Sequence, residues 1–279
     1  MSEPIRLTLS YPNEKQQRFL ECTAKYIAFG GARGGGKSWA LRRKLVALCL
    51  RYPTIRCLLV RRSYAELKAN HVDPLLREYA GLIQYRESDK RLDFPNGSSI
   101  SLGYCSSNRD VLRYQGQEYD IIAIDEATQL NEYQFSIFKA CLRGVGNVPR
   151  RMYLTCNPGG VGHAWVKRLF IDRRYEPGEN GGEYAFIPAR VTDNGALLAR
   201  QPDYLKTLEA LPPKLRRAWL EGRWDIMEGQ VFQEFTDDPA HYEDRQWTHV
   251  IRPFDVPREW SVYRSYDFGY AKPFSCGWG

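Results

Sequence analysis

The chain has 279 residues, a formal net charge of +7 at pH 7 and 43% hydrophobic residues. This length accommodates one large domain or two smaller ones, and the composition is typical of a soluble globular protein. The sequence has no apolar stretch near the roughly 20 residues that span a bilayer, and its N-terminus lacks a signal-peptide core. The basic balance favours a polyanionic partner such as nucleic acid. The seven cysteines show neither paired nor metal-type spacing, so we expect reduced thiols in a cytosolic protein.

The first predicted element is a short amphipathic helix over residues 11–20. Gln16 shares a face with Phe19 and Leu20 by i, i+3, i+4 spacing, so its amide is expected to point inward. Two roles fit an inward glutamine. It could read the edge of an adenine base, or it could cap the buried edge of a sheet.

A glycine-rich loop follows the apolar stretch 26–29. From Gly31 it reads G-x-x-x-x-G-K-S in the strand–loop–helix context that defines a phosphate-binding loop. Its backbone N–H groups and the following helix N-terminus attract phosphate, Lys37 reaches the terminal phosphates, and Ser38 offers a hydroxyl to magnesium. The motif is too complete for a Gly-rich surface loop. The predicted nucleotide-binding residues of the loop are Gly31, Ala32, Arg33, Gly34, Gly35, Gly36, Lys37 and Ser38.

The middle of the chain alternates between strand and helix patterns. Residues 55–60 have the pattern of a buried strand, residues 64–79 that of a helix broken near Pro74, and residues 91–102 that of a hairpin around Asn96-Gly97. This alternation indicates an α/β fold.

Two adjacent carboxylates end the next buried strand, within residues 119–127. In a parallel sheet, catalytic groups lie at the carboxyl ends of the strands. Asp125 is then placed to hold magnesium opposite Ser38, and Glu126 to orient and deprotonate the attacking water. An acidic turn after a strand is the alternative. Given the loop upstream, the pair indicates hydrolysis.

A third strand, 151–156, ends at Asn157-Pro158-Gly159-Gly160. An amide at this position can sense the γ-phosphate, which makes Asn157 a candidate nucleotide-binding residue. A plain turn built on Asn-Pro-Gly is the other interpretation.

Together these elements predict a P-loop NTPase of the ASCE (RecA-like) type, with a mostly parallel central sheet flanked by helices. We expect the ATPase core at residues 1–190 and a small helical linker or lid subdomain at residues 191–230. A third region covers residues 231–279.

The ordered motifs resemble the large terminase subunit, the DNA-packaging motor of tailed bacteriophages. The resemblance covers nearly the whole chain. The motifs that carry it are Gln16, the loop GGARGGGKS at 30–38 with Arg33, IIAIDEATQ at 121–129, LTCNPGG at 154–160, the linker-like segment 211–225 and the stretch 229–234 leading to a nuclease.

The resemblance implies an ATP-hydrolysing motor that uses ATP and Mg²⁺ to move double-stranded DNA into the procapsid. Glu126, Arg33 and Lys37 take the catalytic roles. The implied partners are DNA bound without sequence preference, the small terminase subunit and the portal protein. The implied assembly is a homo-oligomeric ring on the procapsid, or a monomer in isolation. The implied location is the host cell cytoplasm, outside the virion.

The C-terminal residues 265–270 resemble the opening strand of the family's ribonuclease-H-like nuclease. There Asp267 matches an aspartate that binds a catalytic metal in the intact protein. Two-metal nucleases need several converging carboxylates, and Asp267 is the one that precedes the end at Gly279. The sequence therefore predicts an incomplete nuclease region and no DNA cleavage.

Ring motors complete their sites with an arginine from a neighbouring subunit. Many large terminases carry it just before the glycine in the run leading to the acidic strand, but this chain has Gln115 before Gly116. The candidates are Arg143, Arg113 and Arg109, each of which also fits a plain surface arginine.

Two other functions fit part of the pattern. A helicase-type ATPase shares the loop and the acidic pair, but it would need a second RecA-like domain. A nucleotide-binding assembly switch with low turnover would not need Glu126.

Overall fold

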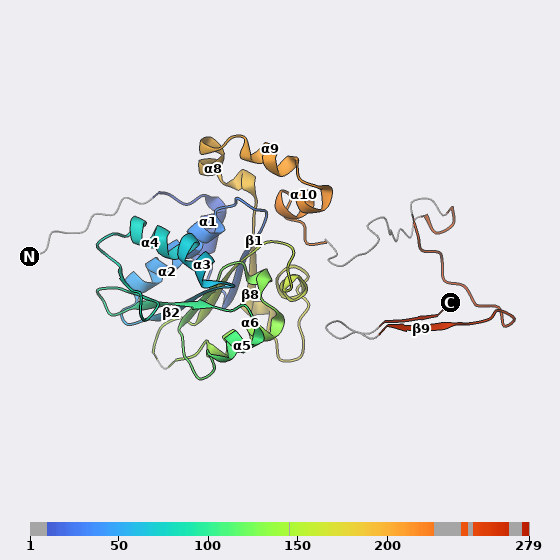
Figure 1. Cartoon of the computed structure of the whole chain (residues 1–279), viewed down its shortest axis with the longest axis horizontal. Coiled ribbons are helices and arrows are strands. Elements are labelled where there is room, and N and C mark those ends of the chain that lie inside the picture. The colour runs from blue at the N-terminus through green and yellow to red at the C-terminus, as the bar shows by residue number, and fades with distance from the viewer. Residues whose placement is uncertain (1–9, 145, 226–240, 245–247, 268–274, 279) are drawn as a thin grey trace, which may run out of the picture. The chain divides into compact units, whose positions relative to one another are not determined.

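The computed structural model describes residues 10–144, 146–225, 241–244, 248–267 and 275–278 (Figure 1). Internal contacts divide the chain into two units, Met1–Glu228 and Gly229–Gly279. In the described part, no helix is long and apolar enough to cross a membrane.

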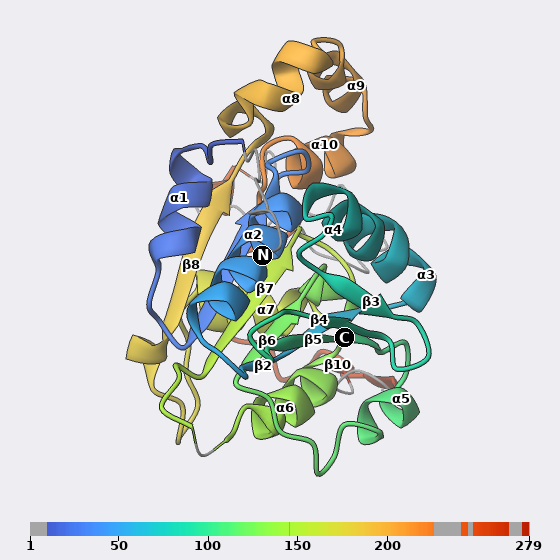
Figure 2. The ribbon, with the colours of Figure 1, turned by 90° about the vertical axis from the view of Figure 1, so that its left-hand side faces the viewer.

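The first unit is built on an eight-stranded sheet in the order β3-β4-β5-β2-β6-β7-β1-β8 (Figure 2). The six strands from β5 to β8 in this order pair in parallel, and β3 and β4 add an antiparallel edge. The predicted α/β fold with a mostly parallel sheet is confirmed. The strands are β1 (Tyr26–Gly31), β2 (Arg56–Arg61), β3 (Gln84–Arg86), β4 (Arg91–Asp93), β5 (Ser99–Tyr104), β6 (Ile121–Ile124), β7 (Arg151–Cys156) and β8 (Tyr184–Ala189).

Helices cover both faces of this sheet (Figure 2). The α-helices are α1 (Glu14–Glu21), α2 (Lys37–Arg51), α3 (Tyr64–Leu67), α4 (Asp73–Glu78), α5 (Asn108–Leu112), α6 (Glu132–Cys141), α7 (His163–Val166), α8 (Gly195–Arg200), α9 (Tyr204–Glu209) and α10 (Pro213–Trp219). Short 3₁₀ turns occur at Ala127–Gln129, Gly181–Glu183 and Val191–Asp193, and π-helical turns at Lys68–Val72 and Lys167–Ile171.

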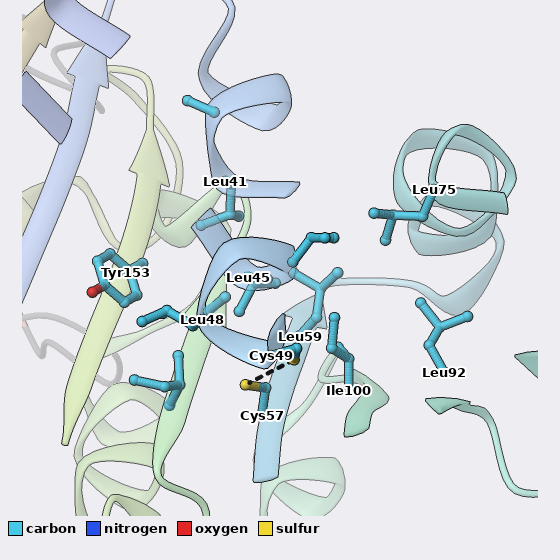
Figure 3. Packing of buried hydrophobic residues seen from close by; sticks show 14 of the residues in the cluster. Leu41, Leu45, Leu48, Cys49, Cys57, Leu59, Leu75, Leu92, Ile100 and Tyr153 are labelled. Atoms are coloured by element: carbon cyan, nitrogen blue, oxygen red, sulfur yellow. Dashed lines mark hydrogen bonds between the residues drawn. The ribbon is translucent and has the colours of Figure 1, made fainter. Parts of the chain in front are cut away.

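Two apolar cores hold the layers together. Every residue of β1 and β6 is buried, as expected for parallel strands covered on both faces. On one face, Leu41, Leu45 and Leu48 of α2 pack with Leu59 of β2 (Figure 3). The other core gathers the apolar side chains of α6 and α7. Both cores brace the strands whose carboxyl ends carry the predicted site.

The cysteines of the described side chains are free thiols. Cys49 of α2 and Cys57 of β2 lie in the core with their sulfur atoms 3.7 Å apart (Figure 3). The spacing of cysteines in the sequence did not predict this contact. The contact with Cys49, followed by burial, raises the pKa of the Cys57 thiol.

The predicted break in the 64–79 helix takes a different form. The chain leaves α-helical geometry before Pro74, in the π-helical turn Lys68–Val72, and Pro74 itself lies in the first turn of α4. A proline is tolerated there because the first N–H groups of a helix have no intrahelical partner. The widened turn places His71 in the interior, fully buried.

In the second unit, β9 (Arg264–Asp267) pairs antiparallel with β10 (Ser275–Trp278). Asp267 is the last residue of β9 and lies opposite Ser275. The side chain of Asp267 and residues 268–270 lie outside the described part.

Candidate nucleotide site

The phosphate-binding loop joins the buried end of β1 to the first turn of α2. Gly36, the residue before the helix, has a φ of 73°, and a Cβ there would lie 2.3 Å from Nε2 of Gln16. Gly31 has a φ of 126°, and its Cβ would lie 2.8 Å from the Ala189 carbonyl oxygen. These positions therefore require glycine for both backbone geometry and close packing.

Lys37 is buried behind this loop, with 7% of its surface exposed. Its Nζ donates to the Ala32 carbonyl at 2.6 Å and to Oδ1 of Asn157 at 2.8 Å. Burial lowers the pKa of Lys37, against the opposing attraction of Glu126. The ammonium group is thus held by two oxygen acceptors beside the loop.

Asp125 is fully buried at the end of β6. Its Oδ1 accepts from Ser38 Oγ at 3.0 Å and from Thr155 Oγ1 at 2.5 Å. Its Oδ2 accepts from Arg61 Nη1 at 3.0 Å and from His71 Nε2 at 2.9 Å. Burial opposes ionisation of this carboxyl, but its contacts with His71, then with Arg61 and Thr155, outweigh burial and lower its pKa.

Glu126 has a φ of 57°, a left-handed geometry uncommon outside glycine. Its N–H donates to Thr155 Oγ1 at 3.0 Å, so Thr155 ties both acidic residues to β7. Its carboxylate accepts from Nδ2 of Asn157 at 2.8 and 3.0 Å. Burial, followed by the charge of Asp125, raises the pKa of Glu126.

Asn157 therefore stands between a cation and a carboxylate. Its Oδ1 accepts from Lys37 while its Nδ2 donates to Glu126, and its backbone carbonyl accepts from Thr128. Because β6, β7 and β1 are neighbours in the sheet, this one amide bridges groups from three strand ends. The structure brings Lys37, Ser38, Asp125, Glu126 and Asn157 together, as the sequence predicts.

Two cavities meet at these residues. The first, of about 540 Å³, is lined by Arg33, Gly34, Gly35, Gly36, Lys37, Ser38, Trp39, Arg42, Arg61, Glu66, Glu126, Gln129, Asn157 and Tyr204. The second, of about 430 Å³, shares Arg33, Glu126, Gln129 and Asn157 with it. Its remaining lining includes Lys214, Leu215, Ala218 and Trp219 of α10. We call the first the nucleotide cavity.

Gln16 lies against the loop rather than in the lining of these cavities. Its Oε1 accepts from the Asn13 N–H at 2.9 Å, and its Nε2 donates to the Gly36 carbonyl at 3.1 Å. Adenine recognition by Gln16 stays a prediction.

The candidate trans-acting arginines lie on the surface. Arg113 stacks on Tyr104 and pairs with Asp110 at 3.3 Å. Arg143 pairs with Glu118 at 3.6 Å, beside the amino end of β6 and so away from the phosphate loop. Arg109 is exposed on α5. The positions of these three arginines do not favour one candidate over the others.

Sequence reasoning gave no role to Arg61, His71 or Thr155, which hold the acidic pair. Arg61 had a usable signal, because it is a cation at the carboxyl end of a buried parallel strand. His71 had none, since its burial depends on the π-helical turn.

A family model described as "Terminase large subunit, T4likevirus-type, N-terminal" matches residues 28–236. The chain belongs to this large terminase family. The resemblance drawn from the motifs is thereby confirmed. No curated protein matches the chain.

Solved terminase structures share the fold. The large terminase of a thermophilic bacteriophage, in complex with ADP, gives a TM-score of 0.66 at 17% identity, over 95% of this chain and 64% of that one. The ATP-gamma-S complex of the same protein gives 0.63 at 18%, with the same coverage. The ATPase domain of the Thermus phage P74-26 large terminase gives 0.54 at 16%, over 77% of this chain and 94% of that domain. The terminase chain thus spans about 64% of the length of the first of these relatives.

Proposed function

We propose that this terminase chain hydrolyses ATP and couples hydrolysis to the movement of double-stranded DNA into the procapsid. The observation that carries the proposal is the chain of contacts from Lys37 through Asn157 to Glu126 at the end of a phosphate-binding loop. The relative from the thermophilic bacteriophage is described in complex with ATP-gamma-S and with ADP, which supports the same choice of nucleotide.

The proposed roles follow from position. The loop N–H groups and Lys37 bind the phosphates, with Arg33 beside them, while Glu126 orients a water molecule and accepts its proton. The left-handed backbone of Glu126 and its bond to Thr155 fix the direction of that carboxylate. A terminal phosphate would compete with Asn157 for the Lys37 ammonium, and this competition is the basis of the proposed sensor role.

Magnesium fits the donor set near Ser38. Its hydroxyl and the Asp125 carboxylate lie 3.0 Å apart and offer the hard oxygen ligands that Mg²⁺ prefers, with waters and phosphate completing the shell. Bound Mg²⁺ would neutralise charge that develops on the phosphates. Ser38 and Asp125 are therefore the proposed magnesium residues.

The proposed partners are double-stranded DNA, the small terminase subunit and the portal protein, in a ring on the procapsid in the host cytoplasm. The net charge of +7 supports contacts with DNA phosphates rather than with base edges. Arg143, Arg113 and Arg109 remain the candidates for the arginine given to a neighbour.

Phosphate release by the isolated chain, with and without DNA, tests the proposal. We expect turnover that requires Mg²⁺ and responds to DNA, with DNA affinity that is independent of sequence and falls steeply with salt. Tight ATP binding without turnover would favour the assembly switch. Strand separation by the chain would favour the helicase.

We also expect no DNA cleavage, because Asp267 is the one nuclease ligand that the resemblance assigns and a single carboxylate cannot hold two ions. Supercoiled plasmid incubated with Mg²⁺ or Mn²⁺ tests this. Nicking that disappears in Asp267→Ala would contradict it.

A further inference from the structure

The guanidinium of Arg33 lies over the ring of Trp219, the last residue of α10. The guanidinium carbon is 3.4 Å from the ring centroid. The backbone N–H of Arg33 donates to the backbone carbonyl of Trp219 at 2.7 Å. Close packing continues after the helix, where a Cβ on Gly222 would lie 2.8 Å from the Ala32 nitrogen. The end of α10 is thus fitted directly onto the phosphate loop.

Stacking leaves the hydrogen-bonding edge of Arg33 available. A guanidinium carries its five N–H donors in its plane, so a ring on one face blocks none of them. Within the described part of the chain, the Arg33 side chain makes no hydrogen bond or ion pair to an acceptor. It nevertheless lines both cavities together with Glu126 and Asn157, and in the nucleotide cavity also with Lys37. The guanidinium is thus supported on one face while its donors stay unused.

We propose that Trp219 is a positioning residue that pre-organises Arg33 for an oxygen of the terminal phosphate. The proposal rests on the proposed ATPase function and extends the site to a residue of the helical segment. A free arginine on an exposed loop would lose several rotatable bonds on contacting phosphate. The Trp219 ring restricts the guanidinium beforehand, and the Trp219 carbonyl holds the Arg33 backbone N–H, so less conformational entropy is lost when phosphate binds.

The effect should be larger on turnover than on substrate affinity. Lys37 and the loop N–H groups hold the phosphates in the ground state, whereas negative charge on the transferring group is stabilised in the transition state by a correctly oriented guanidinium. We expect Trp219→Leu to lower kcat about tenfold, in line with the strength of a partly desolvated cation–π contact. The KM for ATP should change less than threefold.

Two further variants distinguish a positioning role of Trp219 from a purely structural one. Trp219→Phe keeps an aromatic face for the guanidinium and should retain kcat within about threefold of the unchanged chain. Arg217→Ala, an exposed change on the same helix, is the matched control and should leave kcat unchanged. Equal losses in the Leu and Phe variants would overturn the proposal.

A double-mutant cycle separates positioning from folding. Arg33→Gln should lower kcat at least as much as Trp219→Leu, and adding Trp219→Leu to Arg33→Gln should cause no further loss. The same tenfold loss in both backgrounds would show that Trp219 acts independently of Arg33 and would overturn the proposal.

Nucleotide binding by the unchanged chain, measured by calorimetry with ATP-gamma-S, keeps the two proposals distinguishable. No binding would overturn the proposed function together with this inference. Binding and turnover that persist unaltered in Trp219→Leu would overturn the inference alone.

Discussion

The nucleotide cavity has a sheet side and a helical side, and their polar groups are satisfied differently. On the sheet side, Asn157 links Lys37 to Glu126, and Thr155 links Glu126 to Asp125. Ser38 also donates to Asp125. On the helical side, residues 191–224, a few contacts reach the loop. They include Asn194 Nδ2 donating to the Gly34 carbonyl at 2.7 Å and Trp219 on Arg33.

The difference follows from burial. A buried charge without a partner costs several kcal/mol, so the sheet side must neutralise its charges internally when no nucleotide is present. In the proposed function, ATP and Mg²⁺ would replace some of these hydrogen bonds when they bind. Most residues of α9 and α10 are exposed, and a segment with few buried contacts opens at low free energy. The charged groups of the sheet side are therefore held by hydrogen bonds before nucleotide binds, whereas the contacts of the helical side with the loop can shift.

The largest expected effect comes from removing the proposed base, Glu126, on the sheet side. Glu126→Gln keeps the size of the side chain but cannot accept a proton, so we expect about a 10³-fold loss of turnover with ATP affinity retained. Phosphate release and equilibrium ATP binding measure the two quantities. Glu118→Gln, an exposed change at the amino edge of the sheet, is the control. Surviving turnover with binding weakened more than tenfold would assign Glu126 to magnesium or structure instead.

Lys37→Ala removes the buried cation that both Asn157 and Ala32 hold. We expect turnover to fall about 100-fold or more, because one preset electrostatic group on a phosphate is lost. Lys206→Ala on α9, whose ammonium pairs with Asp203 in solvent, is the matched control and should have no effect. If Lys37→Ala kept its turnover within twofold of the unchanged chain, the assignment of this loop to the nucleotide site would be wrong.

The groups that sequence could place are those defined by short-range patterns. The loop from Gly31 to Ser38 and the carboxylates after β6 follow from residue order. The predicted strand 151–156 has the same limits as β7, because a buried parallel strand is read from its own composition.

The groups that sequence missed depend on contacts between distant segments. Arg61 reaches Asp125 because β2 and β6 are neighbours in the sheet, an order that local pattern does not fix. His71 reaches Asp125 because a π-helical turn redirects it. Trp219 lay within the predicted linker, but its stacking on Arg33 requires the fold of that segment onto the loop.

Asn157→Ala probes whether the sheet side acts as one network. The change removes one acceptor of Lys37 and the donor to Glu126, so a buried and a half-buried charged group each lose a partner. We expect turnover to fall about tenfold and the free energy of unfolding to fall by about 2 kcal/mol. Thermal denaturation and phosphate release check both. Asn147→Ala, on an exposed loop, is the control. A loss of turnover with stability unchanged would mean that the two charges find other partners.

Gly222→Ala gives the smallest effect and tests how firmly the helical side is attached. Gly222 has a φ of 68°, and an added Cβ would lie 2.8 Å from the Ala32 nitrogen. Gly116 is the matched control, because its φ is 82° and nothing lies within 4 Å of an added Cβ. Gly116→Ala should therefore show the cost of left-handed backbone geometry alone, about 1 kcal/mol.

If the helical side is loosely attached, the extra clash in Gly222→Ala is relieved by a local shift of residues 219–222 away from the loop. The two variants would then have melting temperatures within a few degrees of each other, while the KM for ATP would rise about threefold in Gly222→Ala alone. Thermal denaturation and steady-state kinetics on both variants decide the matter. A melting temperature that falls much further in Gly222→Ala would show that the segment is a fixed part of the core. The contrast between the two sides of the cavity would then be wrong, because residues 219–222 could not shift without unfolding the domain.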